Sequence, residues 1–334
     1  MVHDGRALAK ARERIFQNRQ NSENDLLSRR EAALTCAPEL ANVETAIKKL
    51  MTNVALDALE RDGDINLAVK KAQGETTILR EKIAAILRQN GFPENQLEER
   101  FSCDSCQDTG YVLGKMCSCL NSAYRDEQSK LLSSMLNLGD QSFASFKLEL
   151  YEPGNTGLTK AEVQLNMQNV FELCRKYAMD FGKDSRSLIF RGGAGLGKTF
   201  LSAAIAKVVS DKGYSVVYDT CVSILEAFES NKFERGTAES GDAALHVKRY
   251  LGCDLLILDD LGTELSTAFT QSALYTLINT RMLTGGKTII STNLSPEELE
   301  RRYSTQIYSR LRGEYLALSF CGRDIRQVKL DRGL

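Results

Sequence analysis

Apolar positions in the second half of the chain form short continuous runs separated by longer stretches with helical spacing. Five of these runs are typical of buried strands and cover residues 187–190, 214–218, 254–259, 287–292 and 315–320. Between them, apolar residues three or four positions apart predict amphipathic helices, for example over residues 159–183. Strands that alternate with helices predict an α/β fold with a five-stranded parallel sheet covered on both faces.

The first hundred residues show a different pattern, in which Ala, Leu, Glu, Lys, Arg and Gln dominate. Apolar residues recur at helical spacing in two sets, which are Val43, Ile47, Leu50, Met51, Val54, Leu56 and Leu59, and Ile78, Ile83, Ile86 and Leu87. We therefore expect a small helical domain over residues 1–100. Its apolar faces could dock a partner protein or close on each other in a self-packed bundle, and both interpretations stay open.

The first predicted strand of the second half runs into a glycine-rich turn, and a predicted helix over residues 200–209 follows it. The turn and the start of the helix read Gly192, Gly193, Ala194, Gly195, Leu196, Gly197, Lys198, Thr199 and Phe200, which fits the phosphate-loop pattern G-x-x-x-x-G-K-[ST]. Glycines let backbone N–H groups approach an anion, and the helix N-terminus adds partial positive charge. We expect Lys198 to bind the β- and γ-phosphates of ATP and Thr199 to bind Mg²⁺. An ordinary glycine-rich turn is the alternative.

A second acidic motif follows the third predicted strand, where four apolar residues lead into Asp259 and Asp260. The carboxyl end of a buried strand would let Asp259 hold Mg²⁺ through water or Thr199, while Asp260 orients or deprotonates the attacking water. A strand that ends in a solvated acidic turn is the alternative. Asn293, Arg310 and Arg326 lie where hydrolysis could use them, or they could be surface and capping residues.

Four of the nine cysteines gather in one short segment, as Cys103, Cys106, Cys117 and Cys119. Turn-forming residues between the pairs could bring the four thiols together around Zn²⁺, which favours soft ligands and stabilises a small knuckle without a core. The second pair is C-x-C, which is tighter than the usual C-x-x-C. A redox or Fe–S role and unliganded thiols are the alternatives. We place a four-cysteine zinc knuckle at 101–120, a linker at 121–150 and an ATPase domain at 151–334.

The composition limits the compartment and the mode of nucleic-acid binding. The 334 residues carry 43 basic and 44 acidic side chains, a formal net charge of −1, so that any contact with nucleic acid must come from a local basic patch. No run of eighteen apolar residues and no signal-peptide core is found in the sequence, so we expect a cytoplasmic protein that does not enter a membrane.

Together these motifs resemble the DnaC/DnaI family of replicative-helicase loaders within the AAA+ ATPases, and the related IstB-type transposition ATPases share most of them. The resemblance covers about residues 140–334 and rests on segments 192–199, 255–264, 274–281, 289–295 and 307–311. The helical region, followed by Cys-x-x-Cys-x-Asp-Thr-Gly-Tyr and Cys-x-Cys, is similar to the loaders of phages and Gram-positive bacteria.

This resemblance implies an N-terminal domain that binds a hexameric DnaB-type helicase and a C-terminal motor that binds ATP and single-stranded DNA. By position, Asn293 resembles sensor 1, Arg310 the arginine finger and Arg326 the sensor-2 arginine. An arginine finger acts in trans on the γ-phosphate of a neighbour, so hydrolysis would require self-assembly on the helicase or on DNA. Segment 227–235 takes the place of a DNA-facing helix, where Lys232, Phe233 and Arg235 could contact DNA or belong to a solvated loop.

Many AAA+ proteins have Glu where this chain has Asp260, which is one methylene shorter. We therefore expect an ATP hydrolase that is slow on its own or stimulated by a partner or DNA. The function predicted from the sequence is helicase loading. The alternatives are an IstB-like, transposase-assisting ATPase that assembles on duplex DNA, and a nucleotide-binding adaptor with negligible hydrolysis.

Overall fold

The computed structural model describes residues 4–60, 65–136, 141–154, 157–233 and 240–333. The chain divides into two compact units, of which the smaller is Arg12–Leu120 and the larger combines Met1–Ala11 with Asn121–Leu334. The domain boundaries expected at residues 100, 120 and 150 stay predictions. None of the helices within these described ranges combines the length and the apolar character needed to cross a membrane.

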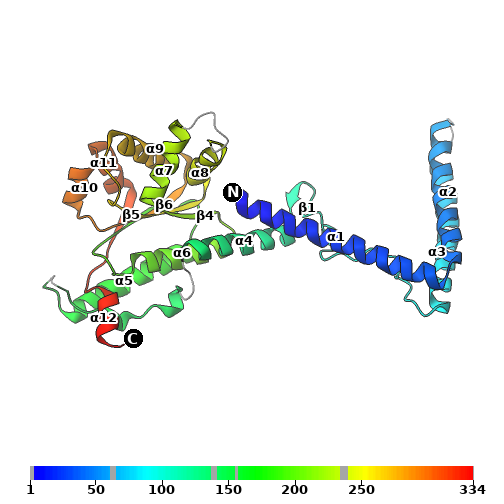
Figure 1. The fold of residues 1–334 in the computed structure, drawn as a ribbon, viewed down its shortest axis with the longest axis horizontal. Coiled ribbons are helices and arrows are strands. Elements are labelled where there is room, and N and C mark those ends of the chain that lie inside the picture. The colour runs from blue at the N-terminus through cyan, green and yellow to red at the C-terminus, as the bar shows by residue number, and fades with distance from the viewer. Residues whose placement is uncertain (1–3, 61–64, 137–140, 155–156, 234–239, 334) are drawn as a thin grey trace. The chain divides into compact units, whose positions relative to one another are not determined.

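A five-stranded parallel sheet forms the centre of the larger unit (Figure 1). Its strands are β3 (Ser187–Arg191), β4 (Val216–Thr220), β5 (Leu255–Leu261), β6 (Lys287–Thr292) and β7 (Tyr315–Ser319). Their spatial order is β4-β5-β6-β3-β7, and every neighbouring pair is parallel. The predicted α/β fold with a five-stranded parallel sheet is therefore confirmed.

One predicted strand starts two residues too early. Strand β4 begins at Val216 rather than at Tyr214. The Tyr214 N–H donates to the Val209 carbonyl at the end of α6, and Ser215 bonds the Asp254 carboxylate through both its N–H and its hydroxyl. These bonds turn the chain before it joins the sheet, so apolar character alone misplaced the boundary.

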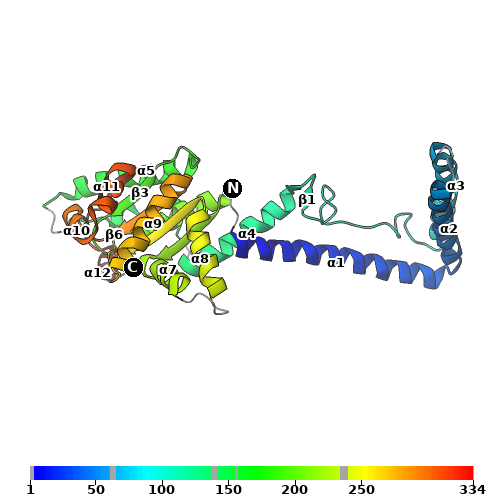
Figure 2. The same cartoon turned by 90° about the horizontal axis from the view of Figure 1, so that it is seen from above.

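The sheet divides the core of this unit into two layers, because alternate strand residues face opposite sides. Leu188 and Phe190 of β3 pack into one layer and Ile189 into the other. The first layer holds α5 (Lys160–Met179) and α6 (Lys198–Asp211). The second holds α7 (Cys221–Phe233), α8 (Ser240–Gly252), α9 (Ala268–Thr284), α10 (Pro296–Arg302) and α11 (Thr305–Glu314). Figure 2 views the sheet from this second side.

Local signals fix where these helices begin and end. Thr159 caps α5, because its hydroxyl accepts from the Glu162 N–H while the Glu162 carboxylate accepts from the Thr159 N–H, which is a capping box. Gly197 precedes α6 and Gly285 follows α9, both in the left-handed conformation that glycine adopts without strain. The helix predicted over residues 159–183 is α5 and ends at Met179.

The stretch between the cysteines and α5 contains ordered structure. Helix α4 covers Ser118–Leu136, and the 3-10 turns Phe143–Ser145 (η1) and Leu148–Leu150 (η2) follow it. Phe146 stacks on Phe171 of α5, with the ring centroids 4.6 Å apart. We call residues 141–151 the strap. Through its aromatic side chains the strap packs against the layer of α5 and α6, and the short C-terminal helix α12 (Ile325–Asp331) makes further contacts with η2.

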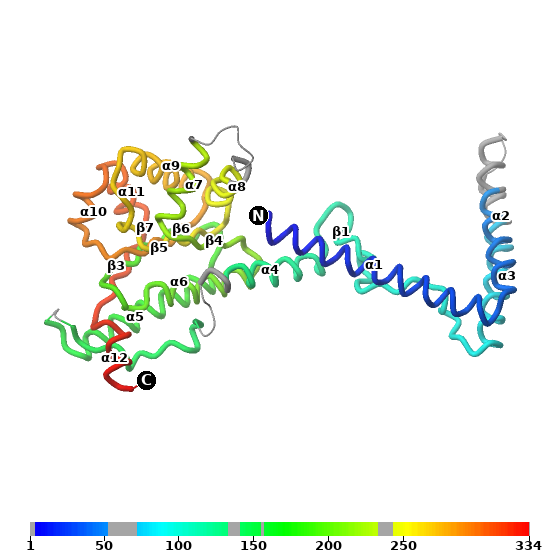
Figure 3. Tube along the Cα trace, viewed as in Figure 1, coloured from blue at the N-terminus to red at the C-terminus, as the bar shows by residue number. Residues whose placement is uncertain are grey.

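The smaller unit is mostly helical. It contains most of α1 (Gly5–Cys36), then α2 (Glu39–Glu60), α3 (Ile65–Gln89) and a hairpin of β1 (Tyr111–Val112) and β2 (Lys115–Met116). Helices α2 and α3 lie side by side (Figure 3). Val43, Ile86 and Leu87 are buried in a small core, as the helical pattern predicts, whereas Met51 and Ile78 are exposed. The side chains of Val54, Leu56 and Leu59 lie outside the described residues.

A buried arginine gives a test of the larger unit's stability. Arg281 of α9 is 1% exposed and donates hydrogen bonds to the carbonyls of Tyr250, Cys253 and Lys287 and to the Thr288 hydroxyl. Arg281→Met removes the donors and leaves these acceptors buried without them. We expect the free energy of unfolding to fall by about 3 kcal/mol or more, measured by urea denaturation.

The matched control for this variant is Leu283→Ala, two residues further along the same helix, where the side chain is 80% exposed. Its free energy of unfolding should stay within about 0.5 kcal/mol of the unchanged protein. Equal stability of Arg281→Met and the control would show that the buried guanidinium does not hold α8, α9 and β6 together.

Candidate functional site

The phosphate loop lies at the carboxyl edge of the sheet, in the turn from β3 into α6. Two of its glycines are required by close approach of the backbone. At Gly192 (φ 145°) a Cβ atom would lie 2.4 Å from the Phe320 carbonyl oxygen, and at Gly195 (φ 72°) it would overlap the Asp324 carboxylate. A side chain at Gly192 would push the loop away from Phe320, which follows β7, whereas one at Gly195 would displace the Asp324 side chain at the start of α12 and hold a strained φ.

Lys198 is the centre of one hydrogen-bond group in this loop. Its buried ammonium donates to the carbonyl oxygens of Gly192 and Gly193 and to Oδ1 of Asn293, each at 2.7 Å. Burial lowers the pKa of Lys198, and the nearby Asp260 and Asp259 act in the opposite direction. The structure therefore brings Asn293, predicted from its place after β6, directly to the phosphate-loop lysine.

Asp259 is the centre of a second group and joins the loop to β5. The Thr199 hydroxyl donates to its Oδ2 at 3.0 Å, and the Tyr218 hydroxyl donates to the same oxygen at 2.6 Å. The Ser291 hydroxyl donates to Oδ1. Asp259 is only 3% exposed, so these three donors stabilise a carboxylate that is otherwise cut off from water. Burial and the bond to Asp259 raise the pKa of Tyr218, so its phenol stays a donor.

Asp260 differs from its neighbour in backbone and in exposure. Its φ is 57°, an uncommon value for a residue other than glycine, and the β5–β6 register shifts between Leu258 and Leu261. The shift turns its exposed side chain into the cavity beside the phosphate loop. Partial burial of the carboxyl group and the charge of Asp259 raise the pKa of Asp260, although the charges of Lys198 and Arg326 act to lower it. A higher pKa makes the carboxylate a better base toward water.

A cavity of about 1040 Å³ lies beside the phosphate loop and is large enough for a nucleoside triphosphate. The phosphate-loop residues Ala194–Phe200, Asp260, Asn293 and Arg326 line it, together with much of the strap. Lys147, Lys207 and Lys329 add positive charge to its lining. Tyr151 of the strap donates to the Leu196 carbonyl at 3.0 Å and so fastens the strap to the loop.

Arg310 lies elsewhere in the larger unit. It donates to Oδ1 of Asn279 at 3.1 Å and to the Tyr275 hydroxyl at 2.9 Å, and both partners belong to α9. It is absent from the residues that line the cavity. Of the predicted DNA contacts, Lys232 lies over the Phe269 ring, with Nζ 5.1 Å from its centroid. The side chain of Phe233 and the whole of Arg235 lie outside the described residues.

Two of the hydroxyl groups that bind Asp259 were not predicted from the sequence. Tyr218 and Ser291 contact Asp259 from the neighbouring strands β4 and β6. Period-2 alternation contains the signal, because Ile257 and Ile289 face the α6 layer and the residues two positions later, Asp259 and Ser291, must face the same side. Finding this signal requires the strand order, which no single motif reveals.

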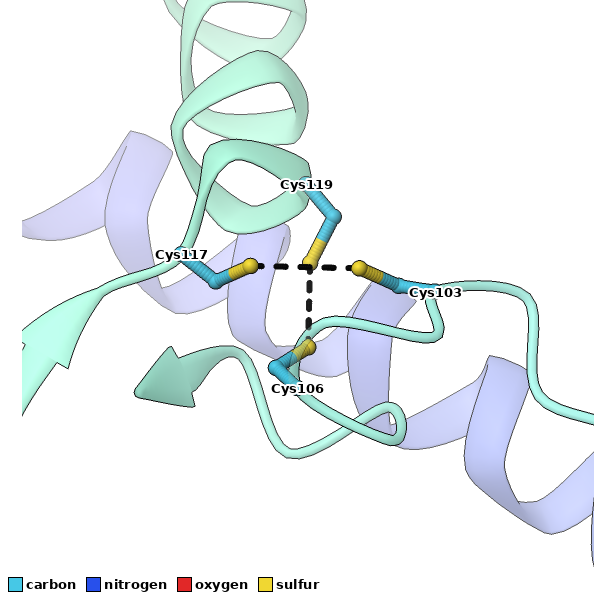
Figure 4. Close-up of side chains that lie close together, drawn as sticks. All are labelled: Cys103, Cys106, Cys117 and Cys119. Carbon is cyan, nitrogen blue, oxygen red and sulfur yellow. Dashed lines mark hydrogen bonds between the residues drawn. The ribbon is translucent and has the colours of Figure 1, made fainter. Parts of the chain in front are cut away.

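The four clustered cysteines converge within the smaller unit (Figure 4). Their sulfur atoms all lie within 4.8 Å of one another. The Cys103 and Cys117 sulfurs are 3.8 Å apart and those of Cys106 and Cys119 are 3.4 Å apart. A disulfide requires about 2.05 Å, whereas four thiolates placed tetrahedrally at about 2.3 Å from Zn²⁺ would be about 3.8 Å apart. The spacing therefore fits a tetrahedral metal site.

Backbone groups favour thiolates at Cys106 and Cys117, whereas burial raises the pKa of Cys119. The Gly110 N–H points at the Cys106 sulfur at 3.3 Å. The backbone of Cys119 lowers the pKa of Cys117 to about 7, although burial acts against it. The buried Asp108 carboxylate accepts from the N–H groups of Ser102 and Cys103, which fixes the first turn of the knuckle. Outer contacts of this kind orient metal ligands in known sites.

Comparisons with known proteins agree with this geometry. Residues 161–307 match the family model described as IstB-like ATP binding protein. The replicative helicase loader DnaC of Escherichia coli K12 is 26% identical over 144 residues, which are 43% of this chain and 57% of that protein. The replicative helicase loader DnaI of Bacillus subtilis 168 is 26% identical over 190 residues, which are 56% of this chain and 55% of that protein.

The chain thus spans somewhat over half the length of each of these two relatives. A solved structure described as the DnaC helicase loader covers 53% of this chain and 98% of its own, with 21% identity and a TM-score of 0.42. A second solved structure, described as DnaI, covers 58% of this chain and 93% of its own, with 20% identity and a TM-score of 0.42.

Two substitutions separate ATP binding from ATP hydrolysis at this site. Lys198→Ala removes the ammonium that we expect to bind the phosphates of ATP, and ATP affinity measured by calorimetry should fall at least about tenfold.

Asp260→Asn keeps the shape of the side chain but removes its charge. ATP should therefore bind within about threefold of the unchanged affinity, while the rate of ATP turnover falls by about 10² or more. If Asp260→Asn retained full turnover, this residue could not be the base.

Proposed function

We propose that this chain is an ATP-dependent replication protein that loads a ring-shaped, DnaB-type helicase onto single-stranded DNA. The proposal is carried by the convergence of Lys198, Thr199 and Asp260 on one cavity, with Asp259 bonded to Thr199 behind it, within a segment that matches an ATP-binding family. The curated relatives named above are replicative helicase loaders, which supports this function over the other candidates.

ATP with Mg²⁺ is the cofactor that the cavity fits. Lys198 and the N–H groups of the loop would bind the phosphates, while Thr199 and Asp259 would hold Mg²⁺, which neutralises phosphate charge when bound. Asp260 would orient and deprotonate water, with Asn293 beside it. Arg326 would bind phosphate from α12, since it lines the cavity and its charge already acts on Asp260. Hydrolysis of ATP, slow without a partner or DNA, is the resulting activity.

Arg310 fits this scheme as a group that acts on a neighbouring protomer. It lies on α11 and is held against Tyr275 and Asn279 rather than in the cavity of its own chain. A fixed guanidinium outside its own site suits an arginine finger supplied in trans. ATP hydrolysis would then depend on self-assembly, which the helicase ring or the DNA strand would bring about.

The N-terminal part would bind the helicase. Within the smaller unit, Phe16, Leu27, Met51 and Ile78 are exposed apolar side chains on α1, α2 and α3. Long helices with apolar residues outside their own core are suited to a partner protein. This interpretation leaves the larger unit for ATP and single-stranded DNA.

Loading can be measured with the full chain, a DnaB-type helicase and a closed single-stranded DNA circle carrying an annealed oligonucleotide. A closed circle has no end, so a helicase ring must be opened before it can encircle the strand. We expect ATP and this chain to raise release of the oligonucleotide at least about tenfold, and Asp260→Asn to bind helicase but stop release. Equal loading by Asp260→Asn would instead indicate an adaptor that does not need hydrolysis.

The IstB-like description of the matched family keeps the transposition-type ATPase as the second candidate. The type of DNA that the chain binds distinguishes this candidate from a helicase loader. No effect on the helicase, combined with tight and ATP-dependent binding of duplex DNA in a fluorescence-anisotropy titration, would favour that function and contradict helicase loading.

Zinc at the cysteine cluster is a separate part of the proposal. The hairpin β1–β2 has two residues in each strand, too few to form a core, so a metal would supply its stability. Elemental analysis of the purified chain should find about one Zn²⁺ per chain. Cys106→Ser with Cys119→Ser should abolish it, while Cys174→Ser, a buried cysteine of α5 in the larger unit, should leave it unchanged. Full zinc content in the double variant would contradict the site.

A further inference from the structure

Asp259 is held by more hydroxyl groups than the phosphate-loop scheme requires. That scheme needs Thr199 and Asp259 beside Mg²⁺. Here Tyr218 contributes a shorter bond to Oδ2 than Thr199 does, 2.6 Å against 3.0 Å, and it comes from β4, a strand with no part in either nucleotide motif. Among the hydrogen bonds described for Tyr218, the bond from its hydroxyl goes to this carboxylate alone.

The sheet explains how a tyrosine reaches this position. In the parallel register of β4 and β5, Tyr218 pairs with Ile257 and Thr220 pairs with Asp259. Tyr218 and Ile257 both pack toward the layer that contains α6. A long phenol two residues short of the end of β4 therefore reaches diagonally forward to the carboxylate, whereas a shorter side chain at this position could not.

We propose that Tyr218 is a positioning residue for Mg²⁺, which acts by holding the Asp259 carboxylate in the orientation that binds the ion. This inference rests on the proposed ATPase function. That function assigns the Thr199 hydroxyl to Mg²⁺. The Ser291 hydroxyl and the Asp260 N–H then hold Oδ1, and Tyr218 is the remaining described donor to Oδ2. Hydrogen bonds to a metal-binding carboxylate restrict its rotation, and losing such a partner typically lowers metal affinity about 10- to 100-fold.

The test substitution is Tyr218→Phe, which keeps the ring against the α6 layer and removes only the hydroxyl. Binding of a fluorescent ATP analogue is measured first in EDTA and then as a function of added Mg²⁺. We expect the affinity in EDTA to stay within about twofold, and the Mg²⁺ concentration that half-saturates the binding signal to rise about tenfold. The same shift should appear in the Mg²⁺ dependence of ATP hydrolysis, with the maximal rate recovered at high Mg²⁺.

The chain offers a close control in Tyr250→Phe. The Tyr250 hydroxyl donates to Oδ2 of Asp219 at 2.7 Å. This is also a bond from a tyrosine to a carboxylate, and Asp219 is the residue next to Tyr218 in β4. Tyr250 contacts neither the phosphate loop nor Asp259 within the hydrogen bonds described. Its loss should leave the half-saturating Mg²⁺ concentration unchanged, so a shift seen only in Tyr218→Phe reports on Asp259 and not on a weakened sheet.

Each outcome decides the matter. An unchanged half-saturating Mg²⁺ concentration in Tyr218→Phe overturns the inference. Loss of nucleotide binding in EDTA by this variant also overturns it, because Tyr218 would then support the fold rather than the ion. The proposed function is tested in parallel by Lys198→Ala. If that variant binds and hydrolyses ATP normally, the function itself fails; if it does not, while Tyr218→Phe behaves like the unchanged protein, only the role of Tyr218 is wrong.

Discussion

The bond between the Thr199 hydroxyl and the Asp259 carboxylate is the contact on which the site depends. The two residues are sixty positions apart in the sequence. Thr199 belongs to α6, the helix that follows β3, and Asp259 belongs to β5, while β6 lies between these two strands in the sheet. Because all the strands are parallel, their carboxyl ends lie at one edge of the sheet, and the turns that follow them must meet there. Any register slip in β5, β6 or β3 would separate the loop from its acid.

The same edge explains how much of the site the sequence predicts. Lys198 and Thr199 follow from a local motif, and Asp259 and Asn293 follow from their places after buried strands. Tyr218 could not be predicted, because its contact depends on β4 lying next to β5. The role of Arg310 is predicted only from its resemblance to a family position, and its bonds to Asn279 and Tyr275 hold it against α9 and not at the cavity. The five strands were predictable from apolar runs, whereas the start of β4 was decided by polar bonds.

Asp259 and Asp260 show how one strand end can produce two carboxylates with different chemistry. The shift in register after Leu258 and the left-handed backbone of Asp260 separate the two side chains. One is buried and held by three hydroxyl groups, while the other is exposed beside the phosphate loop. Such a backbone costs about 1–3 kcal/mol, which the surrounding sheet must offset. The side chain of Asp260 is one methylene shorter than that of glutamate. How far its carboxylate extends toward the phosphate loop therefore depends more on the position of its backbone.

The two units are stabilised by different means. The larger unit buries both faces of its sheet under helices, and apolar burial at about 25 cal/mol per Å² is sufficient to hold such a fold. The segment around Cys103 and Cys119 has strands of two residues and no comparable core among the residues described there. Four converging cysteines, with N–H groups aimed at Cys106 and at Asp108, would place negative charges close together once their thiols are deprotonated. A divalent cation removes that repulsion, so the geometry of the knuckle is itself an argument for metal.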